Sequence, residues 1–153
     1  MIHRKIHIND WCADIFFCIT RYEEDVLELA FRGANAPIEK IVRMREIARD
    51  DEYNTGLTYS NASRRKSVMV VGKATSIDEF FNSFCHELRH LTDDIAYEER
   101  IGLRGEAVGY LQGGIGRLLT DMVGMFLCPQ CNQNSRNDGT KYRTSKPYSL
   151  RRR

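Results

Sequence analysis

The chain has 153 residues, of which 42% are hydrophobic and 29% are charged, and its formal net charge at pH 7 is +2. This length fits one domain whose core is large enough to be stable without disulfides. No apolar run approaches the roughly 20 residues of a membrane helix, and the first residues lack the pattern of a secretion signal. These observations exclude a membrane protein and lead us to expect a cytoplasmic one.

Charge and cysteines are unevenly distributed along the chain. Residues 128–153 carry seven Lys or Arg and one Asp, a net charge of +6, whereas residues 1–127 carry 16 basic and 20 acidic side chains, a net charge of −4. Five cysteines without regular spacing indicate reduced thiols and argue against a disulfide framework. We therefore expect a folded domain over residues 1–127 and a flexible, basic C-terminal tail over residues 128–153.

The first part of the chain predicts two strands followed by two helices. Residues 3–9 alternate weakly between apolar and polar, and residues 13–20 are rich in β-branched and aromatic side chains, which favours a buried strand. Residues 22–31 and 38–50 each place apolar side chains on one side among charged ones, which is the pattern of an amphipathic helix. The first of these helices is expected to end near Gly33.

The following segments predict two neighbouring strands and a long helix. Residues 55–61 and 67–73 are short runs with apolar and β-branched residues, joined by a polar, basic link. Ser76 is a suitable helix N-cap, and Glu79 stands three residues later, so the two form a capping box for a helix over residues 77–95.

A second long helix is expected over residues 106–127, after a turn that contains Gly102 and Gly105. Together these elements predict an α+β fold in which a small sheet packs on helices. No internal repeat or interdomain linker interrupts residues 1–127.

The strongest chemical signal is the HExxH motif of His86, Glu87 and His90 in the helix expected over residues 77–95. Residues four apart project from one side of a helix, so two imidazoles can reach one zinc ion at about 2.0–2.1 Å, with the glutamate beside the metal-bound water as general base. The two histidines lie opposite the apolar stripe of this helix, so they are not core residues. That stripe consists of Ile77, Phe81, Phe84, Leu88, Leu91 and Ile95.

The helix expected over residues 106–127 supplies a candidate third ligand. Its apolar stripe leaves Glu106 and Tyr110 together on the other side, flanked by glycines. Glycine within a helix costs about 1 kcal/mol relative to alanine, and close approach of another backbone is the usual compensation. We therefore expect this side to pack near the HExxH helix and to bring Glu106 to the metal. The flanking glycines are Gly109, Gly113 and Gly116.

Other acidic residues stay open as the third ligand, namely Glu98, Glu99 and Asp93. Asp93 shares the histidine side of its helix, but it stands two turns from His86, which is a poor reach for a single ion. A role as hydrogen-bond acceptor that orients a ligand histidine suits Asp93 better.

The order of strands, HExxH helix, turn and glutamate helix resembles the zincin metallopeptidases of the gluzincin branch. The matching residues are His86, Glu87 and His90 on one helix and Glu106 on the next, and at this length the chain is similar to minimal gluzincin domains of prokaryotes and their viruses. The resemblance implies a zincin-like fold, a Zn²⁺ cofactor, peptide-bond hydrolysis with Glu87 as general base, and Glu106 as third ligand. It also implies that the strand over residues 67–73 forms the cleft rim and pairs with an extended substrate.

The chain departs from the gluzincin pattern in three ways. Arg89 is charged where proteolytic motifs prefer an uncharged residue, and only 15 residues separate His90 from Glu106. No separate His or Tyr beyond Glu106 is marked as the donor that stabilises the oxyanion. Tyr110 is our candidate for that catalytic role, with Tyr97 second.

The tail carries a second, weaker metal signal. Cys128 and Cys131 form a CxxC pair, which is half of a zinc ribbon, and no Cys or His follows it. A second zinc would need partners from elsewhere, and two reduced thiols remain the leading interpretation. The partners within the chain would be His3, His7, Cys12 and Cys18.

Two functions remain open on the sequence alone. The first is a zinc metallopeptidase that acts on a peptide or protein. The second is a non-catalytic, zinc-stabilised interaction module, for which Arg89 and the weakly marked oxyanion donor speak. In either case the basic tail could contact nucleic acid or an acidic partner, although a solubilising flexible tail is the simpler interpretation.

Overall fold

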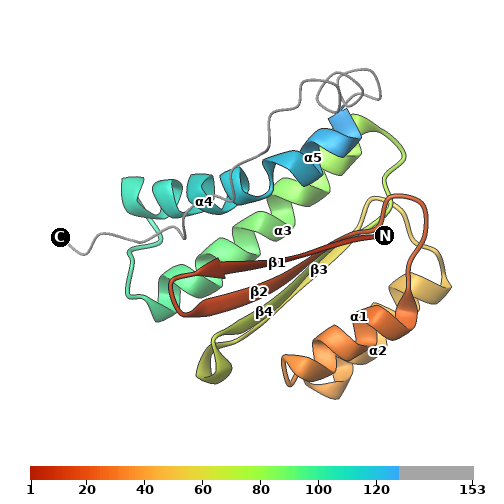
Figure 1. The fold of residues 1–153 in the computed structure, drawn as a ribbon, viewed down its shortest axis with the longest axis horizontal. Coiled ribbons are helices and arrows are strands. Elements are labelled where there is room, and N and C mark those ends of the chain that lie inside the picture. The colour runs from red at the N-terminus through yellow and green to blue at the C-terminus, as the bar shows by residue number, and fades with distance from the viewer. Residues whose placement is uncertain (128–153) are drawn as a thin grey trace, which may run out of the picture.

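The computed structural model describes residues 1–127, which form a four-stranded mixed sheet between two layers of α-helices (Figure 1). The elements in chain order are β1 (Ile2–Ile8), β2 (Trp11–Phe17), α1 (Glu24–Gly33), α2 (Ile38–Arg49), β3 (Gly56–Asn61), β4 (Lys66–Val71), α3 (Ile77–Glu98), α4 (Glu106–Leu118) and α5 (Thr120–Leu127). Helices α1 and α2 cover one face of the sheet, and α3, α4 and α5 lie on the other. The predicted α+β class is confirmed.

Two apolar cores result from the alternation of side chains along the strands. On β2, Ile15 and Phe17 face α3, whereas Phe16 faces α1 and α2. On β4, Met69 joins the first group and Val70 the second. Each face of the sheet is therefore covered by its own helices. Separately, no helix within residues 1–127 is both long and apolar enough to cross a membrane.

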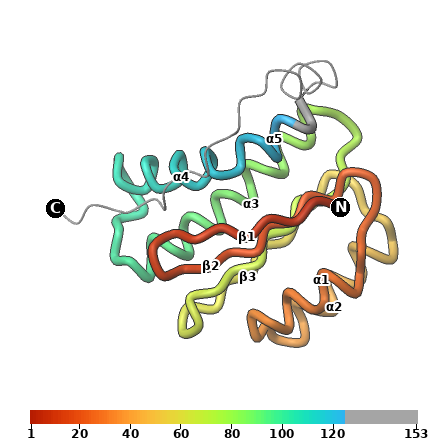
Figure 2. Tube along the Cα trace, in the orientation of Figure 1, coloured from red at the N-terminus to blue at the C-terminus, as the bar shows by residue number. Residues whose placement is uncertain are grey.

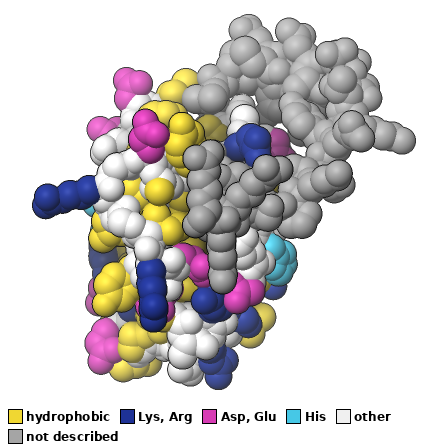
Figure 3. All heavy atoms as spheres, turned by 90° about the vertical axis from the view of Figure 1, so that its left-hand side faces the viewer, with side chains coloured by type: hydrophobic (Ala, Val, Ile, Leu, Met, Phe, Trp, Pro, Cys, Tyr) yellow, Lys and Arg dark blue, Asp and Glu magenta, His cyan; other side chains and the backbone are white. Residues whose placement is uncertain are grey.

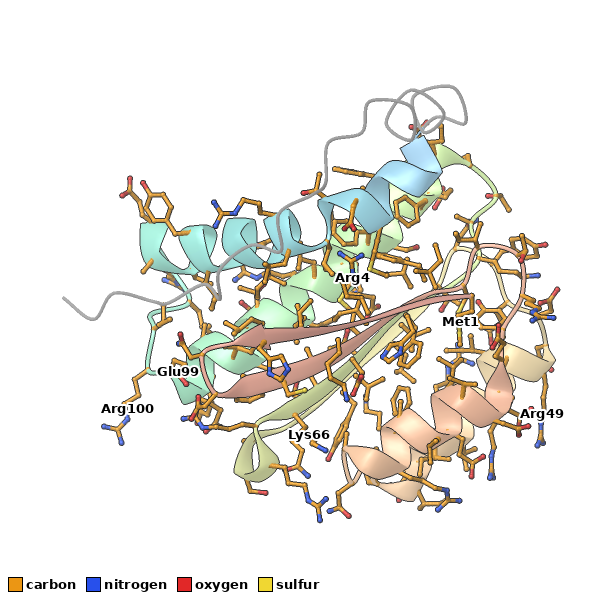
Figure 4. All side chains as sticks on the ribbon, in the orientation of Figure 1. Met1, Arg4, Arg49, Lys66, Glu99 and Arg100 are labelled. Atoms are coloured by element: carbon orange, nitrogen blue, oxygen red, sulfur yellow. The ribbon has the colours of Figure 1, made fainter. Side chains whose placement is uncertain are left out.

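The N-terminal strands form a tight hairpin, in which Ile8 pairs with Trp11 and the intervening Asn9 adopts a φ of 55°. The second strand was expected over residues 13–20, and it begins and ends earlier because the hairpin turn fixes its register. Arg4 on β1 reaches α5, where its Nη2 lies 2.6 Å from the Oδ2 atom of Asp121 (Figure 4). This ion pair joins the edge strand to the last described helix.

Helices α1 and α2 are the two helices that were expected over residues 22–31 and 38–50, and they pack against each other. Their buried side chains pack on the sheet, and their polar sides are linked by ion pairs between the two helices. Glu28 accepts hydrogen bonds of 2.7 Å from both Arg32 and Arg45, and Glu24 accepts one of 2.9 Å from Arg49. These arginine contacts, that of Arg45 first, lower the pKa of the Glu28 carboxyl.

The position of the third and fourth strands corrects one prediction. The strand order is β1-β2-β4-β3, with β4 parallel to β2 and antiparallel to β3. The segment over residues 67–73, expected at the rim, thus lies inside the sheet, and β3 forms the edge. The physical reason is visible in burial, because the Ser67–Val71 part of β4 is buried throughout, as in strands covered on both faces, while every residue of β3 is half-buried.

Helix α3 begins as predicted, with the Ser76 hydroxyl accepting a hydrogen bond from the Glu79 amide at 3.2 Å. The expected single helix over residues 106–127 is instead two helices with a break at Leu119. The Leu119 amide turns back to Gly116 O at 3.0 Å, and the Thr120 hydroxyl donates to Arg117 O at 3.1 Å. This local competition with helical hydrogen bonding ends α4, and α5 then carries Met122 into the core.

Helix α4 runs back alongside α3, as the trace in Figure 2 shows. Its contact side consists of Val108, Leu111 and Ile115, all of them buried. The layer of α3 is thus held between the sheet and α4, which fixes the direction of the HExxH side chains.

Candidate functional site

His86 and His90 stand one turn apart on the exposed side of α3. Their Nε2 atoms are 3.0 Å apart, and their ring planes meet at 81°. Two nitrogens bound tetrahedrally at about 2.0–2.1 Å from a zinc ion would lie roughly 3.3 Å apart. The two imidazoles therefore already converge nearly as a shared metal ion requires.

Glu87, the residue between them, is buried against the edge strand β3. Its side chain is only 4% exposed, and its Oε2 atom accepts a hydrogen bond of 2.7 Å from the hydroxyl of Thr58. The same hydroxyl lies 3.3 Å from the Glu87 carbonyl oxygen. Thr58 thus anchors Glu87 from a strand 29 positions away in the chain.

Gly56 at the start of β3 leaves room for this carboxylate. A Cβ atom at position 56 would lie 2.4 Å from Cγ of Glu87, which is closer than real side chains pack. The sequence inspection missed both Gly56 and Thr58, although a glycine within a strand often marks the close approach of another group. Together they hold Glu87 between the histidine side of α3 and the sheet.

These residues line an open groove of about 470 Å³ between α3 and the outer edge of β3. His86, Glu87, His90 and Asp94 come from α3, and Lys40 reaches the groove from α2 on the other side of the sheet. Because β3 is an edge strand, its outer backbone groups are not paired within the sheet. The groove therefore combines the HExxH side chains with a free strand edge.

Glu106 and Tyr110 lie elsewhere in the described structure. Both are exposed on the first turns of α4, Tyr110 by 68%, and neither lines the groove. In residues 1–127, no three His, Cys, Asp or Glu side chains are placed to hold one ion. The structure brings His86, Glu87 and His90 together, and it does not bring Glu106 to them.

The glycine argument for the approach of α4 is corrected by the contacts. A Cβ atom at Gly109 or Gly113 would meet nothing within 4 Å, and only one at Gly116 would face α3, 3.7 Å from Cδ2 of Leu88. Helix α4 packs on α3 with its apolar side instead, so Gly109 and Gly113 do not line that contact.

Asp93 is engaged by Arg89 and makes no hydrogen bond with either histidine. Nε of Arg89 donates to Oδ2 of Asp93 at 2.8 Å, one helical turn away. Oδ1 of Asp93 is buried and finds no hydrogen-bond partner in the part of the chain described. This pairing also explains the charged residue within the motif, because Arg89 turns along α3 toward Asp93 and the Leu103 carbonyl.

The end of the molecule where α3 ends and α4 begins faces the viewer in Figure 3, and hydrophobic side chains gather on it. Exposed apolar residues of these segments are Tyr97, Leu103 and Tyr110. Tyr97, the second candidate oxyanion donor, is 73% exposed and does not line the groove.

The cysteines near the candidate sites differ in burial. Cys18 is fully buried, and burial raises the pKa of its thiol to about 12, so it stays protonated and cannot meet a surface ion without opening the core. Burial also raises the pKa of the Cys85 thiol next to the motif. Cys128 and Cys131, the residues considered for a second zinc, lie outside the described residues, as does the basic tail.

Comparison of the chain with protein-family models, with curated proteins and with solved structures gives no match. The groove, the histidine pair and the anchored Glu87 are therefore interpreted from their own geometry.

The seating of Glu87 leads to a stability prediction. We expect Gly56→Ala to lower the free energy of unfolding by about 1–3 kcal/mol, because the added methyl group must displace the anchored Glu87 side chain. The matched control Gly113→Ala adds the same group in open space within a helix, and should raise stability by up to about 1 kcal/mol. Urea unfolding of both variants measures the difference, and equal stabilities would show that Glu87 is not held against β3.

Proposed function

We propose that the protein is a zinc-dependent metallopeptidase of zincin-like fold, in which His86, His90 and Glu106 hold the metal. The observation that carries this proposal is the convergence of two imidazole Nε2 atoms, 3.0 Å apart, beside a buried, anchored glutamate. If the two histidines only stabilised the fold, the carboxylate of Glu87 would not need to lie between them and the free edge of β3.

His86 and His90 lie nearly as a shared zinc ion requires, whereas Glu106 does not lie beside them. Binding of the metal would have to draw the first turn of α4 toward the histidines. Glu106 is free to follow, because it makes no ion pair with any other residue of the described range. Tyr110 shares its side of α4 one turn later, so the proposed oxyanion donor would arrive together with the third ligand.

When bound, zinc would supply a water molecule whose pKa is lowered to about 7 and polarise the scissile carbonyl. Glu87 would accept the proton of that water through Oε1, which has no hydrogen-bond partner among the described residues, while Thr58 holds Oε2. Glu87 would also be the group that returns the proton to the leaving amine. The role of Thr58 is to position the base, since it touches neither water nor substrate in this scheme.

The free edge of β3 supports a peptide as the substrate. An extended peptide can add to an exposed strand edge through main-chain hydrogen bonds, and this one runs past the histidine pair and Glu87. The edge strand thus replaces the segment over residues 67–73 as the proposed cleft rim.

A second candidate function is a non-catalytic, zinc-stabilised interaction module. One observation favours it, namely that Glu106 and Tyr110 are exposed on α4 and away from the groove. Such a module would bind zinc through the same histidines but would not turn over peptides.

The test combines zinc content with turnover. We expect one zinc per purified chain and cleavage of a fluorescently labelled unfolded protein, lost with a chelator and restored by zinc. Glu106→Ala should weaken zinc binding at least tenfold, while Glu98→Ala, which removes another acid considered as ligand, should leave it unchanged. Zinc without turnover would favour the interaction module, and unchanged zinc affinity in Glu106→Ala would remove Glu106 from the ligand set.

A further inference from the structure

The groove has two walls of opposite charge on either side of the β3 edge. On the α3 side, Asp94 follows His90 by one turn, and on the opposite side Lys40 of α2 lines the groove. Of the described residues that line the groove, Lys40 is the only Lys or Arg.

Within residues 1–127, Lys40 is also without a charged partner. Its neighbours on the polar side of α2 are engaged, since Arg43 binds Glu52 at 2.7 Å and Arg45 binds Glu28 at 2.6 Å. Among the described residues, no carboxylate forms an ion pair with Lys40, and no hydrogen bond engages its ammonium group. An unpaired ammonium at the wall of a groove is available to an incoming anionic group.

The geometry of an added strand places ligand side chains against each wall. Successive residues of a strand point to opposite faces of the sheet, so a peptide paired with β3 would send alternate side chains toward α3 and toward α2. Those on the α3 side meet the HExxH residues and Asp94. Those on the α2 side pass Lys40.

We propose that Lys40 is a specificity-determining residue, which selects peptides with Asp or Glu on the α2 side of the segment opposite Gly56–Ser60. This preference is a substrate specificity only if the proposed function holds. The preference itself concerns peptide binding, so it can be measured without turnover. Lys40 is exposed, so the contact is a rim ion pair, expected to change affinity by about three- to fivefold and to weaken as salt is raised.

The experiment uses the full zinc-loaded chain and sets of fluorescein-labelled peptides that differ only by Glu, Gln or Lys at one position. Affinity is measured by fluorescence anisotropy with the Glu87→Gln protein, in which the peptides should not be cleaved. The value of kcat/KM is measured with the protein that retains Glu87. We expect a preference for Glu over Lys at alternate positions, lost in Lys40→Met and reversed in Lys40→Glu. The matched control is Arg100→Glu, because Arg100 projects into solvent beyond the end of α3 and should keep the original preference (Figure 4).

The outcomes separate this inference from the proposed function. An unchanged preference for Glu in Lys40→Glu overturns the role of Lys40, even if the peptides are cleaved. A reversed binding preference without cleavage by the unaltered protein supports Lys40 and contradicts the peptidase. Peptides that neither bind nor are cleaved overturn both.

Discussion

Glu87→Gln is expected to reduce peptide cleavage by about 10²- to 10⁴-fold while leaving zinc binding and the fold intact. The substitution keeps the shape of a side chain that is only 4% exposed and is seated beside Gly56. The Gln carbonyl oxygen can still accept the hydrogen bond that Thr58 now gives to Oε2. What the amide cannot do is accept a proton from water, so the loss should fall on kcat and not on metal content.

The measurement requires three readouts on the same preparation: kcat on a peptide that the unaltered protein cleaves, zinc per chain, and the midpoint of urea unfolding. Glu79→Gln is a suitable control, because Glu79 is half-buried on the first turn of α3, does not line the groove, and serves the Ser76 cap through its backbone amide. We expect this control to retain full activity. Undiminished turnover in Glu87→Gln would end the assignment of Glu87 as general base.

The sequence predicted those features that depend on neighbouring residues. The capping box of Ser76 and Glu79 predicted the start of α3, and the HExxH spacing predicted two histidines on one side of that helix. The apolar patterns of residues 22–50 and 55–73 also predicted the two helices and the two strands of these segments. Each of these signals lies within a few consecutive residues, where backbone preference and side-chain pattern indicate the same element.

The errors came from contacts between distant segments. The order of the strands put β4 inside the sheet, although its continuous apolar run could have indicated a strand buried on both faces. The glycines of α4 were assigned to a contact with α3, whereas Gly109 and Gly113 face open space.

The same distinction applies within the candidate site. Glu87 and the histidines could be named from five consecutive residues, but the anchor of Glu87 could not. Thr58 and Gly56 meet it only because β3 becomes the edge strand beneath α3. Lys40 likewise joins the groove only because α2 covers the opposite face of the sheet.

His86→Ala is expected to abolish stoichiometric zinc binding and, with it, the stabilisation that zinc gives to the folded state. A ligand that binds only the folded chain stabilises it by about 2.7 kcal/mol when its concentration is 100 times its dissociation constant. Removal of one of two convergent imidazoles leaves His90 without the partner 3.0 Å away, and one imidazole with one carboxylate is a poor zinc site. The unfolding midpoint of His86→Ala should therefore be the same with zinc as with chelator.

His3→Ala separates this metal effect from the loss of an ordinary histidine. His3 stacks on Phe16, with ring centroids 4.4 Å apart, and its Nε2 lies 2.8 Å from Oδ1 of Asp14, so its removal should destabilise β1 equally with and without zinc. The stability lost in His86→Ala is assigned to zinc if the variant is less stable than the unaltered protein when both are supplied with zinc. The two proteins should then be equally stable when both are stripped of metal. If His86→Ala instead keeps one zinc per chain, the ion is held elsewhere, and the convergence of the imidazoles reflects a hydrogen bond between them.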